Sequence, residues 1–165
     1  MRRLIVLLVL ASLVALDSTL PVAAGGQPAA FVRVKADTVN LRERPSGKSD
    51  RLGQAYENDP LRVLDENGSW LKVRDFEGHE GWVSRQLTDE RPTVIVKVPL
   101  ANIRSGPGTK HAVTYTANRG VAFLVRQRKG QWLEVAHADG ARGWIYRGLV
   151  WGAAEGSDGS GSTPN

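Results

Sequence analysis

The sequence predicts an all-β protein in which two small β-barrels follow one another along the chain. First, the segment near residues 32–88 recurs near residues 94–150 at a constant shift. Second, short segments within each copy alternate apolar and polar residues between Gly, Pro, Asn or Asp, a pattern typical of strands. Third, no long stretch has the apolar spacing of a helix.

The two copies share uncommon residue types at matched positions. The matched segments are Asn40-Leu41-Arg42 with Asn102-Ile103-Arg104, Pro45 with Pro107, the strand at Trp70 with that at Trp132, and Gly81-Trp82-Val83 with Gly143-Trp144-Ile145. Each pair is 62 residues apart, since 102 − 40, 132 − 70 and 144 − 82 give the same value. Trp, Gly and Pro do not coincide this often by chance, so the chain contains two copies of one module.

Four strands are predicted in the first copy, and the same four are expected in the second. They cover residues 38–42, 61–65, 70–74 and 80–83. Gly68 and Gly130 lie in tight turns before the third strand, where a positive φ favours glycine, and Gly78 and Gly140 lie in the next hairpin. About five strands in fewer than 60 residues are expected to curl into a barrel.

Residues two apart in a strand share a face, which separates the predicted core from the surface. The predicted core residues are Leu41, Leu61, Val63, Leu71, Val73 and Val83 in the first copy and Ile103, Phe123, Val125, Leu133, Val135 and Ile145 in the second. Trp82 and Trp144 are expected to cover one end of each barrel. Trp151 corresponds to Asp89, since 151 − 62 = 89, and we expect it to close the second barrel or the interface between the copies.

The two ends of the chain do not share the strand pattern. Arg2 and Arg3 precede an apolar run and small residues at 22–24, which predicts a secretory signal peptide cleaved after Ala24. The run is shorter than the roughly 20 residues that span a bilayer, and a retained anchor is the alternative. The predicted domains are 1–24 (signal peptide), 32–88 (first barrel), 94–151 (second barrel) and 152–165 (a disordered tail rich in Gly, Ser and Asp), with a linker over 88–93.

Composition and charge restrict the possible partners. The 165 residues include no Cys, which excludes disulfides, thiolate metal sites and a cysteine nucleophile. Residues 31–92 carry 11 Lys and Arg against 12 Asp and Glu, whereas residues 93–151 carry nine against two, a net charge of +7. An anionic partner is therefore expected at the second copy, and export favours an envelope polyanion over nucleic acid. The alternative is a basic surface that is merely solvated, one form of which would dock against the acidic first copy.

The sequence offers no constellation of catalytic or metal-binding residues. The histidines are His79, His111 and His137, and none is matched in the other copy or has a partner at ligand spacing. Asp75, Glu77 and Glu80 crowd one hairpin, where a polar turn is favoured over an acid/base pair. We therefore expect no enzyme activity, no cofactor and no metal.

The order of these motifs resembles the bacterial Src-homology-3 (SH3b-like) domain. The resemblance is carried by Val39-Asn40-Leu41-Arg42, a Gly/Pro loop, the Gly-x-Trp-x-x-Val strand and Gly81-Trp82-Val83, and it recurs in the second copy. Residues 105–109 have the family's usual loop, whereas residues 43–47 depart from it. The resemblance implies two tandem small SH3-like β-barrels and a non-catalytic targeting module of the bacterial envelope, a class of which some members bind peptidoglycan peptides.

Aromatic and basic residues are the candidates for ligand binding. They are Trp70, Trp132, Tyr56 and Tyr115 as stacking or lid residues, and Arg42, Arg104, Arg126 and Arg128 as anion contacts. We expect an exported monomer, periplasmic or extracellular, without a transmembrane span after signal removal, that recognises peptidoglycan or another anionic wall polymer. The alternative is a periplasmic adaptor that binds an extended peptide of an envelope protein.

Overall fold

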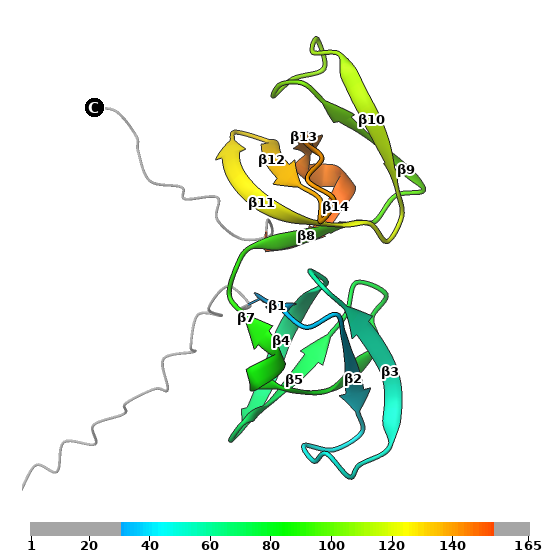
Figure 1. The fold of residues 1–165 in the computed structure, drawn as a ribbon, viewed down its shortest axis with the longest axis vertical. Helices are drawn as coiled ribbons and strands as arrows, with labels where there is room; N and C mark the ends of the chain where they lie inside the picture. Colours follow the sequence, from blue (N-terminus) through cyan, green and yellow to red (C-terminus); the bar gives the residue numbers. More distant parts are fainter. Residues whose placement is uncertain (1–30, 154–165) are drawn as a thin grey trace, which may run out of the picture.

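The computed structural model describes residues 31–153, which form two all-β barrels of the same topology (Figure 1). The first barrel contains β1 (Phe31–Val34), β2 (Thr38–Arg42), β3 (Arg51–Tyr56), β4 (Pro60–Asn67), β5 (Trp70–Arg74), β6 (Glu80–Ser84), the 3₁₀ turn η1 (Arg85–Leu87) and β7 (Thr88–Asp89). The second contains β8 (Thr93–Val96), β9 (Leu100–Arg104), β10 (Val113–Asn118), β11 (Ala122–Lys129), β12 (Trp132–Ala136), β13 (Arg142–Tyr146), η2 (Arg147–Leu149) and β14 (Val150–Gly152). The repeat in the sequence is therefore a repeat in the structure. The predicted signal peptide and most of the predicted tail lie outside the described residues.

Each barrel is one antiparallel sheet of seven strands. The strand order is β3-β2-β6-β5-β4-β1-β7 in the first barrel and β10-β9-β13-β12-β11-β8-β14 in the second. The tight turns before β5 and β12 contain Gly68 at φ 56° and Gly130 at φ 55°, as their positions in the sequence predicted.

The Gly-Trp pairs lie where each sheet curls onto its first hairpin. A Cβ atom on Gly81 would lie 2.9 Å from the Cβ of Leu41, and one on Gly143 would lie 2.5 Å from the Cγ2 of Ile103. Only a glycine lets β6 approach β2, and β13 approach β9, this closely. The recurring Gly-Trp motif is therefore a requirement of the fold.

The cores contain the predicted residues with two exceptions. Ten of the twelve predicted residues are buried, whereas Val63 and Val125 are only half-buried. Both lie at register shifts, between Val63 and Asp65 in β4 and between Val125 and Gln127 in β11. Such bulges bend the strand and turn a side chain away from the regular alternation.

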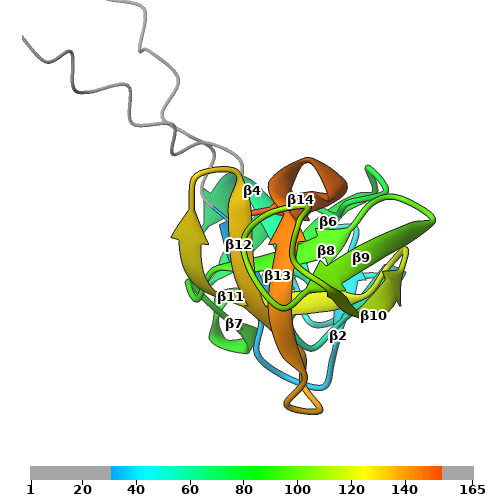
Figure 2. The same ribbon diagram turned by 90° about the horizontal axis from the view of Figure 1, so that it is seen from above.

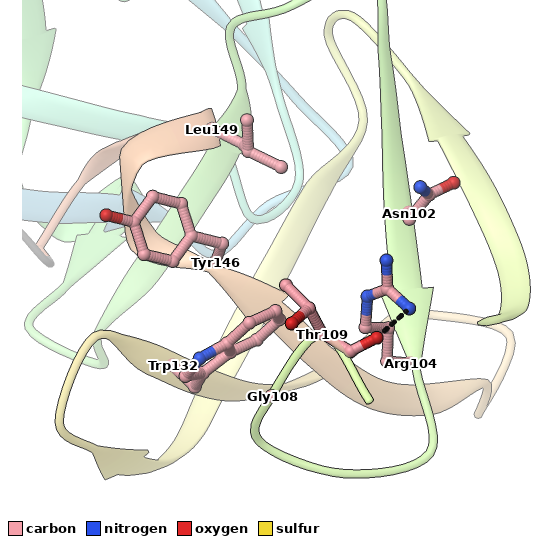
Figure 3. A pocket seen from close by; sticks show the side chains of 7 residues that line it. All are labelled: Asn102, Arg104, Gly108, Thr109, Trp132, Tyr146 and Leu149. Carbon is pink, nitrogen blue, oxygen red and sulfur yellow. Dashed lines mark hydrogen bonds between the residues drawn. The ribbon is translucent and has the colours of Figure 1, made fainter. Parts of the chain in front are cut away.

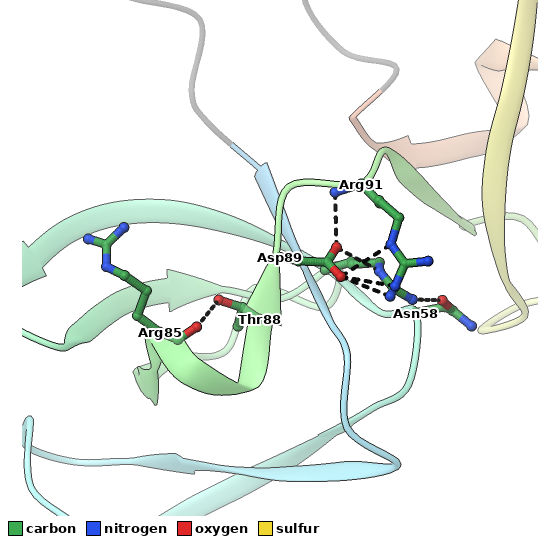
Figure 4. Close-up of polar contacts among 6 residues, drawn as sticks. Asn58, Arg85, Thr88, Asp89 and Arg91 are labelled. Atoms are coloured by element: carbon green, nitrogen blue, oxygen red, sulfur yellow. Dashed lines mark hydrogen bonds and ion pairs between the residues drawn. The ribbon is translucent and has the colours of Figure 1, made fainter.

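The predicted linker over 88–93 is shorter in the structure. Thr88–Asp89 form β7, which pairs with β1, and Thr93 already belongs to β8. Asp89 accepts hydrogen bonds from the guanidinium of the buried Arg33 and from Arg91, and Asn58 accepts a third bond from Arg33 (Figure 4). Charged partners thus hold the end of the first barrel together, a contact that strand periodicity does not reveal.

The two barrels lie one above the other along the long axis of the molecule, and Figure 2 looks along that axis. The ring of Phe31 in β1 meets the ring of Trp151 in β14 edge to face, with 5.0 Å between their centroids. Arg119 lies over the ring of Phe76 and 3.8 Å from a carboxylate oxygen of Glu77. Through its contact with Phe31, Trp151 contributes to the interface between the copies. Among residues 31–153, no helix is long and apolar enough to cross a membrane.

Candidate binding groove of the second barrel

A surface hollow of about 480 Å³ lies on the second barrel between the loop after β9 and the strands β12 and β13. Its lining residues are Asn102, Arg104, Gly108, Thr109, Trp132, Tyr146 and Leu149, and we call it the aromatic groove. Figure 3 shows Trp132 and Tyr146 on one side of it, Asn102 and Arg104 on the other and Thr109 between them. The groove thus joins aromatic faces to hydrogen-bonding groups.

Trp132 and Tyr146 form the aromatic wall. They are register partners on β12 and β13, and their rings meet edge to face at 5.7 Å between centroids. The ring of Tyr146 also packs on Gly148, where an added Cβ would lie 2.7 Å from Cε1 of the tyrosine. The glycine therefore makes room for the ring, and the pair offers a ligand a large apolar area at small entropic cost.

Arg104 positions the loop that forms the opposite wall. Its Nη1 donates to the backbone oxygens of Thr109 at 3.1 Å and of His111 at 2.8 Å. Arg42 does the same in the first barrel, where its Nη1 donates to the backbone oxygen of Ser49 at 2.6 Å. The arginine of the recurring Asn-x-Arg motif therefore holds the adjacent loop in both barrels, and the anion contact predicted for it stays a prediction.

Besides Arg104 on β9, the hairpin between β11 and β12 brings basic side chains near the groove. Lys129 is the register partner of Trp132, so both side chains point to the same face of the sheet. Arg128 pairs with the buried Leu133 and belongs to the other face. The register thus places Lys129 beside the aromatic wall, while the predicted Arg126 and Arg128 lie farther along the same strand.

The equivalent face of the first barrel has different chemistry. Ser84 is the register partner of Trp70, at the position that Tyr146 has opposite Trp132. Arg85 donates to the carboxylate of Glu66 at 2.6 Å, a contact that balances charge beside this face. The second barrel has Arg147 at the position of Arg85 and Arg128 at the position of Glu66. It therefore has two positive charges where the first barrel has an ion pair.

The structure separates the other predicted site residues from the aromatic groove. Tyr56 is 58% exposed on β3 of the first barrel and lies near the interface between the barrels. Tyr115 is half-buried on β10 and lines a different hollow of the second barrel. Of the eight predicted residues, only Arg104 and Trp132 line the groove, and Arg42 and Trp70 hold the matching positions in the first barrel.

Tyr146 completes the groove but is absent from the residues predicted for the site. A comparison of the two copies could have identified Tyr146, because Tyr146 and Gly148 stand where the first copy has Ser84 and Gln86. Within the part of the chain that the structure describes, no group of three or more His, Asp or Glu side chains could hold a metal ion. The groove presents two aromatic rings together with the hydrogen-bonding side chains of Asn102, Arg104 and Thr109.

Comparison with known proteins places this fold in a family. Residues 37–89 match one family model described as a bacterial SH3 domain, and residues 97–152 match a second model of the same description. The chain is a tandem of two bacterial SH3 domains. The aromatic groove is thus a feature of the second SH3 domain, and the loop held by Arg104 is part of that domain.

The chain is similar to two curated proteins, one named as an amidase and one as a cell wall-binding protein, and to one solved structure. The tandem is 24% identical over 143 residues to the "Putative N-acetylmuramoyl-L-alanine amidase YrvJ" of Bacillus subtilis, with 79% of this chain and 27% of that protein covered. It is 26% identical over 92 residues to the "Cell wall-binding protein YwsB" of Bacillus subtilis, with 55% of this chain and 52% of that protein covered. The solved structure of NlpC2 from Trichomonas vaginalis aligns with a TM-score of 0.36 at 14% identity, over 82% of this chain and 52% of that one. The tandem therefore spans only about a quarter to a half of these curated relatives.

Proposed function

We propose that this chain is an exported, non-catalytic protein that binds the bacterial cell wall. The second SH3 domain would provide the main contact, in the aromatic groove, with peptidoglycan or another anionic wall polymer as the ligand. The observation that carries the proposal is the pairing of Trp132 with Tyr146 beside Lys129, opposite a loop fixed by Arg104. The names of the relatives, one of them a cell wall-binding protein, support the same choice of ligand.

The charge of the second domain supports an anionic ligand. Its nine Lys and Arg against two acidic residues attract a polyanion such as a wall polymer with free carboxylates. The nearly balanced charge of the first domain gives it no comparable attraction. Two domains on one chain can still gain avidity when both reach the same polymer, with the first as the weaker contact.

The proposal is tested by co-sedimentation of residues 25–165, which keep both barrels whole, with purified peptidoglycan sacculi over a salt series. We expect binding that persists at about 0.3 M salt, because screening weakens exposed charge attraction but leaves stacking in a shaped groove. Binding that disappears at that salt concentration would indicate general adhesion to polyanions. Absence of binding at every salt concentration would overturn the proposal and favour the alternative of an adaptor for an extended peptide.

Two matched variants locate the contact. Trp132→Ala removes half of the aromatic wall, and we expect binding about 10-fold weaker, as for a central aromatic contact worth about 1.4 kcal/mol. Trp70→Ala removes the equivalent side chain of the first domain, which faces Ser84, and we expect less than a 3-fold change. Equal losses in the two variants would contradict the assignment to the second domain.

A further inference from the structure

A second hollow of about 490 Å³ lies on another side of the second barrel, where β10 faces the turn between β12 and β13. Its lining includes Tyr115, Ala117, Val121, Phe123, His137 and Asp139 and shares no residue with the aromatic groove. Ala117 and Phe123 belong to the buried core, and Val121 packs against it. The floor of this hollow, which we call the Tyr115 pocket, is therefore apolar.

The hydroxyl of Tyr115 is the exceptional group in this pocket. Its oxygen is buried and has no hydrogen-bond partner among residues 31–153. A buried hydroxyl without a partner costs roughly 1–3 kcal/mol, which a ligand that supplies an acceptor would recover. Burial, together with the nearby charge of Asp139, raises the pKa of Tyr115, so the group remains a neutral donor.

The carboxylate of Asp139, a hydrogen-bond acceptor, and the imidazole ring of His137 complete the rim of the Tyr115 pocket. The carboxylate of Asp139 accepts a hydrogen bond from the backbone N–H of Ala141 at 2.8 Å and lies 3.0 Å from Nδ1 of His137. These contacts lower the pKa of Asp139 and keep it ionised, and its other lone pairs can accept a further N–H. His137 itself rests edge to face on Phe123 at 5.6 Å between centroids.

The first barrel shows that the fold does not require Tyr115. The equivalent residue is Gly53, on the strand β3, and the equivalents of His137 and Asp139 are Asp75 and Glu77. That barrel forms the same sheet and the same core without a tyrosine at this position. The buried hydroxyl is therefore an addition specific to the second domain.

We infer that the Tyr115 pocket is a second binding site, which takes the acetamido group of an N-acetylated amino sugar. The methyl group would lie against Ala117, Val121 and Phe123, the carbonyl oxygen would accept from the Tyr115 hydroxyl, and the amide N–H would donate to Asp139. An acetamido group carries the methyl, the carbonyl and the amide N–H at the end of a side group, so it can enter a hollow. An alanine within a peptide has the same groups but is flanked by backbone on both sides, which keeps it from entering in this way. This inference rests on the proposed function for the choice of a wall sugar.

The test is a titration of the chain with tri-N-acetylchitotriose, followed by ¹³C NMR of the methyl groups of Ala117 and Val121. We expect saturable shifts at both methyl groups, and we expect the Trp132→Ala variant to keep them because the aromatic groove is separate. Trialanine is the second probe, and we expect it to leave both signals unchanged. Shifts with trialanine alone would overturn the assignment to a sugar, and shifts with neither probe would overturn the site.

Tyr115→Phe removes only the hydroxyl and gives opposite expectations for binding and stability. Affinity for tri-N-acetylchitotriose should fall about 2- to 10-fold, as for one neutral hydrogen bond. The free energy of unfolding without ligand should stay equal or rise, because an unpaired buried hydroxyl is lost. Unchanged affinity in this variant would overturn the role of the hydroxyl. A chain that binds the sugar at Ala117 but not the sacculi would refute the proposed function alone.

Discussion

Arg33 and Asp89 form a two-pronged ion pair that joins the first and last strands of the first barrel. Nε and Nη2 of the arginine donate to the two carboxylate oxygens at 2.8 and 2.9 Å, and the arginine is only 3% exposed. The second barrel has Ile95 and Trp151 at these positions, so the same strand pair is apolar there. One fold thus closes its barrel with charge in one copy and with apolar packing in the other.

Asp89→Ala should destabilise the first barrel strongly. The substitution leaves the Arg33 guanidinium buried without its counter-charge, and loss of one member of a buried pair costs about 3–5 kcal/mol. Because Asp89 is partly exposed and Asn58 still accepts from Arg33, we expect about 2–4 kcal/mol, measured by urea unfolding. The double variant Arg33→Ile, Asp89→Leu, which makes this strand pair apolar as it is in the second barrel, should be more stable than Asp89→Ala alone. A double variant as unstable as Asp89→Ala would contradict this account.

Trp151→Ala should weaken the coupling between the two domains. The edge-to-face contact with Phe31 crosses the interface, and such pairs contribute about 0.5–1.5 kcal/mol beyond the area they bury. A double-mutant cycle with Phe31→Ala should give a coupling energy in that range, measured by thermal unfolding. A coupling energy near zero would mean that the two rings do not stabilise each other.

Exchange of residues between the two domains should transfer part of the binding to sacculi from the second domain to the first. Tyr146→Ser gives the second domain the residue of the first and should weaken binding to sacculi about 5- to 10-fold through the loss of one aromatic contact. In the first domain, Ser84→Tyr with Gln86→Gly supplies both the ring and the space that Gly148 provides in the second. We expect the pair, assayed with Trp132→Ala in the same chain, to restore part of the binding. No restoration would indicate that the basic side chains decide the location of the site.

The repeat and the turn glycines predicted the two barrels and four of the seven strands in each, because periodicity and positive φ are local properties of the chain. Three strands of each barrel were missed. The edge strands β3 and β10 have mostly exposed side chains with little alternation, whereas β1, β7, β8 and β14 are only two to four residues long. The groove could be predicted only in part. Trp132 faces away from the core by simple alternation, but its partnership with Tyr146 depends on the register of a neighbouring strand.

The roles of the arginines depend on contacts that a linear pattern does not show. Arg42 and Arg104 were predicted to contact an anion, which stays a prediction, and the structure adds that Nη1 of each donates to backbone oxygens of the adjacent loop. Those oxygens belong to irregular segments, where the direction of a carbonyl follows from the loop conformation. Charge counts identified the basic second domain, while the burial of Arg33 could not be predicted from its position in a short apolar strand.

Asp59 should make the stability of the first barrel depend on pH. Burial raises its pKa from 3.8 to about 6, the backbone N–H of Tyr56 opposes that change, and the charge of Asp75 adds to it. The folded state therefore binds a proton at a higher pH than the unfolded state does. The cost of the buried charge is fully present above about pH 6, and the wild-type chain should gain stability as the pH falls from 6 toward 3.8.

Asp59→Asn removes that titration and keeps an oxygen that can accept from the N–H of Tyr56, a bond of 2.8 Å in the wild-type chain. After allowance for the solvent that reaches the partly exposed carboxylate, we expect the variant to be more stable by about 1–2 kcal/mol at pH 7. The difference should shrink toward pH 4, where the wild-type carboxyl is protonated. Urea unfolding of both chains at pH 7.5, 6 and 4.5 measures it, with Asp37→Asn at an exposed position as the control. Parallel pH profiles of Asp59→Asn and the wild-type chain would show that Asp59 is not the group responsible.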